Sequence, residues 1–198
     1  MPPKPKITKD MILHAVLDLT RETGFETVNA RSIADRLNCS TQPIFTCYQN
    51  MEILKQDFLN LAFDFYEQYV SHYYETTHID PCLVLPVSYV EFAKEESLLF
   101  KLLFISDIAL NMSETQDFYQ EIGNQEKAKA FSQKIGVDLE KGKEIFLNLF
   151  LYVHGVAVLT ALGKLSFSRK DITSMMKNML LALVNQKQSA DCPQGGTQ

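Results

Sequence analysis

Residues 24–59, GFETVNARSIADRLNCSTQPIFTCYQNMEILKQDFL, decide the fold of this chain. The stretch predicts two short helices joined by a turn of three or four residues, followed by a longer helix. Small and apolar residues recur at a spacing that places them between the two short helices, and such a pattern is typical of a helix-turn-helix. These residues are Ile33, Ala34, Leu37, Cys39, Ile44 and Tyr48.

Polar residues mark the ends of these helices. Asn29 is expected to cap the first short helix, and Asn38, which tolerates the left-handed conformation, is expected to end it. Ser40 is expected to cap the second, with Pro43 in its first turn, where a missing N–H costs little. Asn50 is expected to cap the long helix that follows.

The side of the second short helix that points away from this small core is polar. It carries Thr41, Gln42 and Thr46, with Phe45 at its flank. Short hydroxyl and amide side chains suit hydrogen bonds to base edges in a major groove, and a helix N-terminus suits phosphate. The residues also fit an αα-hairpin of an unrelated helical protein, so both interpretations stand at this point.

Helical patterns continue on both sides of this stretch. Thr8 and Gly24 bound a helix before it, and Asp80-Pro81 ends the long helix after it. Further helices are expected over 82–95, from Ser97, from a capping box at Ser113 and Gln116, over 138–163, and over 169–187 after Ser168. The chain is therefore predicted to be all-α with about nine helices. The tail 188–198 is expected to be disordered.

Composition supports a globular protein. The chain has 198 residues, of which 46% are hydrophobic and 22% charged, and its net charge is −5. The first 60 residues hold as many basic as acidic side chains, so the negative charge belongs to the remainder. Three lysines precede the first acidic residue and would form a basic arm, although a solvated tail is the plainer interpretation. They are Lys4, Lys6 and Lys9.

Cysteines and histidines give no sign of a metal site. The four cysteines form no C-x-x-C pair, which argues against a zinc ribbon or a disulfide scaffold and favours a reducing cytoplasm. The four histidines show no ligand spacing. We also find no Gly-rich phosphate loop, no G-x-S-x-G and no H-E-x-x-H, so we expect neither an enzyme nor a cofactor.

Residues 12–59 resemble the DNA-binding region of the TetR family of transcriptional repressors. The resemblance is carried by Gly24-Phe25, Arg31-Ser32-Ile33-Ala34, Leu37-Asn38-Cys39-Ser40, Ile44-Phe45, Tyr48 and Leu54. It covers about a quarter of the chain. It implies a helix-turn-helix domain over 1–50 and a larger helical effector-binding and dimerisation domain over 51–187.

The resemblance also implies roles for individual residues on double-stranded DNA. Thr41, Gln42 and Thr46 would contact bases, and the backbone set Arg31, Ser40, Tyr48 and Lys55 would hold phosphates. The chain departs from the family at three positions. Phe45 replaces a tyrosine whose hydroxyl touches a phosphate, Met51 replaces a common lysine, and Asn38 stands where glycine is most frequent.

Residues 145–162, IFLNLFLYVHGVAVLTAL, contain no charged side chain and meet the lower length limit of a membrane span. We favour a soluble helix with two buried faces. One face would pack on its own domain and the other on a second copy, as in the family's four-helix dimer interface. The predicted interface residues are Leu147, Leu151, Val158, Met175, Met179 and Leu183.

Aromatic residues are plentiful in the helical domain, where they form ordinary core or line an apolar effector cavity. The candidate effector contacts are Tyr69, Tyr89, Phe92, Phe104, Phe118, Tyr119 and His154. The sequence thus predicts a cytoplasmic, homodimeric repressor released from its operator by a small apolar or aromatic effector. Two alternatives remain, an all-α carrier or enzyme for a lipid-like molecule and an adaptor that has lost DNA binding.

Overall fold

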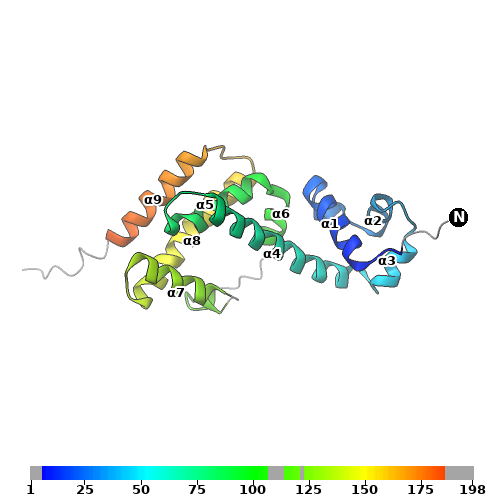
Figure 1. Ribbon diagram of the computed structural model, residues 1–198, viewed down its shortest axis with the longest axis horizontal. Coiled ribbons are helices and arrows are strands. Elements are labelled where there is room, and N and C mark those ends of the chain that lie inside the picture. The colour runs from blue at the N-terminus through cyan, green and yellow to red at the C-terminus, as the bar shows by residue number, and fades with distance from the viewer. Residues whose placement is uncertain (1–5, 107–113, 121–122, 186–198) are drawn as a thin grey trace, which may run out of the picture. The chain divides into compact units, whose positions relative to one another are not determined.

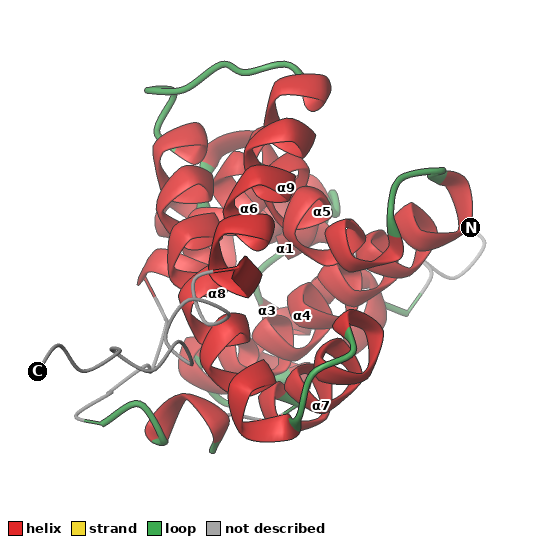
Figure 2. Ribbon diagram, turned by 90° about the vertical axis from the view of Figure 1, so that its left-hand side faces the viewer, coloured by secondary structure: helices red, strands yellow, loops and turns green. Residues whose placement is uncertain are grey.

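The computed structural model describes residues 6–106, 114–120 and 123–185, and within these ranges it contains nine α-helices and no strand (Figures 1 and 2). The prediction of an all-α chain with about nine helices is therefore confirmed. The described helices end at Asn185, so the predicted tail 188–198 lies outside the described residues. The chain divides into two compact units, each of which combines segments that are distant in sequence.

Unit 1 consists of the described residues of 1–71 and 95–108. It holds α1 (Lys9–Thr23), α2 (Ala30–Arg36), α3 (Gln42–Cys47), most of α4 (Met51–Thr76) and α6 (Ser97–Lys101). A π-helical turn, Leu102–Ser106, continues α6. The sequence predicts one continuous helix from Ser97. In the structure the α-helix instead changes to a π-helical turn at Leu102.

Local capping explains the boundaries in unit 1. The Thr8 side chain accepts a hydrogen bond from the Met11 N–H at the start of α1, and Gly24 ends this helix at φ 89°. Asn50 Oδ1 accepts from the Ile53 N–H at the start of α4. The expected cap of α3 is one residue off, because Thr41 rather than Ser40 occupies the N-cap position, and it makes no side-chain cap bond.

Unit 2 consists of the described residues of 72–94 and 109–198. It holds the end of α4, most of α5 (Pro81–Glu95), α7 (Asn124–Ile135), α8 (Leu139–Ala161) and α9 (Arg169–Asn185). α5 is helical through Pro86, so the helical interpretation of 82–95 is confirmed. α4 stops at Thr76, earlier than the predicted break, and Asp80 instead caps the start of α5 through the Cys82 N–H.

The start of α7 differs from the prediction. The capping-box pattern indicates a helix from Ser113, which lies outside the described residues. The structure instead has a 3₁₀ turn, Asp117–Tyr119, and α7 begins only after Gly123. Gly123 adopts the left-handed conformation at φ 82°, and this conformation interrupts a helix.

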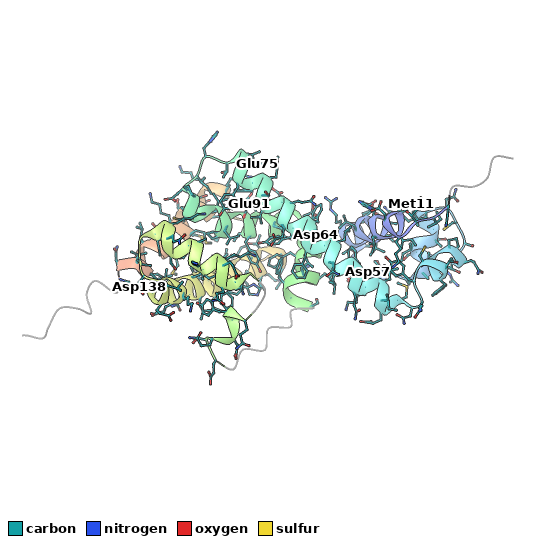
Figure 3. All side chains as sticks on the ribbon, turned by 60° about the horizontal axis from the view of Figure 1, so that its bottom comes forward. Met11, Asp57, Asp64, Glu75, Glu91 and Asp138 are labelled. Atoms are coloured by element: carbon teal, nitrogen blue, oxygen red, sulfur yellow. The ribbon has the colours of Figure 1, made fainter. Side chains whose placement is uncertain are left out.

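α8 lies at the centre of unit 2 and packs against α7 and α9. Asp138 caps its N-terminus by accepting from the Lys141 N–H, and the Asp138 label marks this end in Figure 3. α8 is the one described helix long and apolar enough to cross a membrane by length and composition. Its inward side is buried in unit 2, at residues including Val153 and Ala157, as expected for a core helix.

Candidate nucleic-acid interface

The turn between α2 and α3 fixes the angle at which α3 leaves α2. Asn38 is left-handed at φ 50°, and no other described non-glycine residue has a positive φ. The Cys39 N–H donates to the Ala34 carbonyl at 2.9 Å and the Asn38 N–H donates to the Asp35 carbonyl at 3.2 Å. These two bonds form the Schellman ending of a helix. The turn expected from Asn38 is therefore present.

A small core behind the turn holds α3 in place. Ile33, Ala34 and Ile44 are buried between α1, α2 and α3, as the apolar spacing predicts. Asn29 closes a full capping box with Ser32 at the start of α2. Because the cap holds α2 and the shared core holds both short helices, α3 presents a fixed face to solvent.

The solvent face of α3 carries the predicted base-contacting residues. Gln42 and Thr46 are exposed, Thr41 is half-buried, and the Phe45 ring is 52% exposed. The Thr46 hydroxyl donates to the Gln42 carbonyl at 2.9 Å, a bond along the helix that the sequence pattern does not reveal. The structure thus brings the predicted residues together on one face.

Three members of the predicted backbone set remain accessible. Arg31 and Ser40 are exposed, and Lys55 is half-buried with its ammonium group 5.7 Å from the Phe25 ring centroid. Of the basic arm, Lys6 is exposed and Lys4 lies outside the described residues. Lys9 pairs with Asp57 at 3.4 Å, and Figure 3 labels Asp57 on α4.

The predicted core position of Tyr48 is confirmed, and its predicted phosphate contact is wrong. Its side chain is 2% exposed and its hydroxyl oxygen is buried, because Tyr48 lies on the inward side at the end of α3. Burial, followed by the nearby Asp57 carboxylate, raises the pKa of Tyr48 to about 12. The Lys9 ammonium lies 4.6 Å from the ring centroid. Tyr48 is therefore a core residue, and in this conformation its hydroxyl is not available to a phosphate.

The other arginine of α2 is bound by acidic side chains. Arg36 forms a close bidentate pair with Glu22 and lies 4.0 Å from Asp18. This pairing raises the pKa of Arg36 and lowers that of Glu22. Arg31 stands apart from these pairs at the first turn of α2. The sequence gives no sign of which arginine is engaged, because the partners of Arg36 come from α1.

Five of the seven candidate effector contacts lie in unit 2, and several of them meet there. The Tyr89 hydroxyl and His154 Nδ1 are 3.0 Å apart, and Phe150 stacks on His154 with centroids 5.7 Å apart. Phe118 lies 4.8 Å from Phe150 and packs edge-on against Tyr119. We call Tyr89, Phe118, Tyr119, Phe150 and His154 the aromatic cluster.

Burial shapes the chemistry of the aromatic cluster. It lowers the pKa of His154, so the imidazole is kept neutral, and together with Glu140 it raises the pKa of Tyr119 to about 12. The remaining candidates are placed elsewhere. Phe92 is fully buried on α5, and Tyr69 and Phe104 belong to unit 1, where the Tyr69 hydroxyl donates to Glu95.

The second half of α8 and one position of α9 expose leucines. Leu151 is 51% exposed, and the other exposed leucines on these helices and at the end of α8 are Leu159, Leu162 and Leu181. Of the predicted interface residues, Val158, Met175, Met179 and Leu183 are half-buried. The predicted interface role of Leu147 is wrong, since Leu147 is only 8% exposed and belongs to the core of its own chain.

Among the residues that the structure covers, no group of three metal-ligating side chains occurs.

Comparisons with known proteins show a likeness in fold. No protein-family model matches the chain. No curated protein matches its sequence. The fold is similar to the crystal structure of Thermus thermophilus FadR, a TetR-family transcriptional repressor, in complex with lauroyl-CoA. The match has a TM-score of 0.52 and 17% identity, and it covers 96% of this chain and all of the other. The predicted resemblance is therefore confirmed at the level of the fold, that of a helix-turn-helix followed by a helical domain.

Proposed function

We propose that this chain, which has the fold of a TetR-family repressor, is a homodimeric transcriptional repressor that binds a palindromic operator and leaves it when an effector binds. The observation that carries the proposal is the fixed, exposed face of α3. Gln42 and Thr46 lie on that face, and Ile44 and the left-handed turn at Asn38 hold it outward. An α-helix of this kind fits a B-form major groove.

The exposure of the side chains decides which residues we propose as base contacts and which as phosphate contacts. Gln42 is placed to read bases, because its amide can bond to adenine N6 and N7 or to guanine. Arg31, Ser40 and Lys55 are placed to hold phosphates, which positions α3 without reading sequence. Since Tyr48 is buried and Arg36 is paired, we expect few phosphate contacts and a shallow salt dependence of binding.

The proposal requires a dimer, because two recognition helices must reach major grooves about 34 Å apart. The outer leucines of α8 and α9 supply an apolar face for it. Gly155 lies on α8, and apart from the backbone of its own helix no described atom comes within 4 Å of a Cβ built there. A glycine inside a helix costs about 1 kcal/mol relative to alanine, and close approach of a second helix would justify that cost.

The proposed effector is small and apolar or aromatic, with the aromatic cluster as its contact region. Lauroyl-CoA is the first candidate to test, because the structurally similar FadR was crystallised with it. Effector and operator would bind alternate dimer geometries, so that each lowers the affinity of the protein for the other.

Selection of duplexes from a random oligonucleotide pool tests the proposal directly. We expect enrichment of an inverted repeat, with loss of binding when lauroyl-CoA, which carries an apolar acyl chain, or a small apolar ligand is added. The Gln42→Ala variant should relax the sequence preference. The matched Arg31→Ala and Lys55→Ala variants should weaken binding to all sequences and flatten the salt slope. Recovery of no preferred duplex, together with tight ligand binding, would favour a carrier or enzyme instead.

A further inference from the structure

We infer that Phe45 reads the 5-methyl group of a thymine in the operator. This inference rests on the proposed function and deepens it, because it names a specificity-determining residue and the base that it selects. Phe45 is 52% exposed, whereas its neighbour Ile44 is fully buried. The phenyl ring therefore lies on the solvent side of α3 and takes no part in the core behind it.

Phe45 shares this side with the polar base-contacting residues. Phe45 and Thr46 follow Gln42 by three and four positions, so both side chains are neighbours of Gln42 on one face of the helix. All three are exposed. A single exposed phenylalanine is ordinary on a protein surface. Here, however, the ring stands among the residues placed to enter the major groove.

The chemistry of the ring limits what it can recognise. A phenyl group has no hydrogen-bond donor or acceptor, so it cannot bond to a phosphate or a polar base edge. In a stacked duplex the apolar group displayed in the major groove is the thymine methyl. Contact with that methyl is the specific interaction open to Phe45 at this position.

Thr46 extends the same apolar preference. Its hydroxyl donates to the Gln42 carbonyl at 2.9 Å within the helix. With its hydroxyl donating along the backbone, Thr46 offers a methyl group to the groove. On the face of α3 the polar Gln42 amide is then flanked by two apolar groups, the Phe45 ring and the Thr46 methyl. This combination suits adjacent A·T and T·A pairs, with adenine bonded by Gln42 and thymine packed against Phe45.

Replacement of thymine by deoxyuridine in the selected operator tests the inference, because it removes only the methyl group. We expect one thymine per half-site whose replacement weakens binding about four-fold, the loss that corresponds to one buried methyl. In the Phe45→Ala variant this difference between thymine and uracil should shrink to the small part that the Thr46 methyl supplies. In Phe45→Tyr, which keeps the ring, it should persist.

Gln42→Ala is the matched control on the same face. It should lose preference at the neighbouring pair and retain the difference between thymine and uracil. Phe45→Ala should also leave the salt slope unchanged, since a methyl contact releases no counterions. Thermal unfolding should confirm that the variant folds, as expected for an exposed ring.

Two results would overturn the inference, and they are distinguishable. If wild-type protein and Phe45→Ala respond equally to uracil at every thymine, the operator is bound but Phe45 does not read it. If selection yields no preferred duplex at all, the proposed function fails and the inference fails with it.

Discussion

At the scale of single residues, Gly142 shows how closely α7 and α8 approach each other. A Cβ built at Gly142 would lie 1.9 Å from Ser132 Oγ and 3.0 Å from the Ser132 Cα. Ser132 is itself buried, and its hydroxyl donates to the Ala128 carbonyl, so it cannot move aside without breaking that bond. The two helices meet where only glycine fits.

The Gly142→Ala variant should therefore lose stability. We expect the free energy of unfolding in urea to fall by about 1–3 kcal/mol, as for other overpacked cores. Gly155→Ala is the matched control on the same helix, with both substitutions made in the monomeric Leu151→Glu background because Gly155 belongs to the proposed dimer face. Apart from the backbone of its own helix it meets no described atom within 4 Å, and it should gain about 1 kcal/mol in the monomer through helix propensity. Equal effects of the two substitutions would contradict the close crossing.

His154 gives a residue-scale prediction about pH. Burial lowers its pKa in the folded chain below the ordinary value of 6.5. The unfolded chain therefore binds more protons than the folded one as the pH falls through 6.5, and folding loses stability there. His154→Gln keeps a hydrogen-bonding group for Tyr89 and removes the titration. Urea unfolding between pH 7.5 and 5.5 should show a steeper loss for the wild type than for the variant. Identical pH profiles would show that His154 does not contribute.

At the scale of elements, α2 depends on its cap. The helix has seven residues, too few to be stable alone. Asn29 Oδ1 accepts from the N–H groups of Arg31 and Ser32 at 3.0 Å each. Asn29→Ala should lower the free energy of unfolding by about 1 kcal/mol, whereas Asn29→Ser should retain most of it. Chemical unfolding of both variants checks this, and similar losses would mean that the cap does not matter.

The elements themselves were largely predictable from local signals. Caps at Thr8, Asn29 and Asn50, with Gly24 and Asn38 as stops, act on nearby backbone groups, so the sequence reveals them. The start of α7 was missed because a capping box indicates a helix wherever it occurs. The pattern at Ser113 and Gln116 therefore predicts a helix start too early, whereas Gly123 marks the position just before the helix begins.

Burial of single side chains was less predictable. The sequence places Tyr48 both in the small core and among the phosphate contacts, and it places Leu147 at a helical position that could face either way. Which side each residue takes depends on partners distant in sequence. The pairing of Arg36 with α1 is non-local in the same way. The residues on the exposed face of α3, in contrast, were predicted correctly. That face is set by Ile44 and the buried residues of α2, which lie within twenty residues of one another in the sequence.

At the scale of the whole molecule, the proposed dimer makes a sharp prediction for α8. Leu151 is 51% exposed, so Leu151→Glu should leave the fold intact and convert the dimer to monomers in sedimentation at micromolar concentration. Leu147→Glu would instead bury a charge in the subunit core and should prevent folding. A wild-type chain that sediments as a monomer would remove the dimer from the proposal.

The placement of Phe150 has a practical consequence. This ring lies between Phe118 and His154 in the aromatic cluster, and the chain contains no tryptophan. A Phe150→Trp variant would carry a lone indole fluorophore at the proposed effector contact region. Its emission would report directly on what enters that region, free of any background from other indoles.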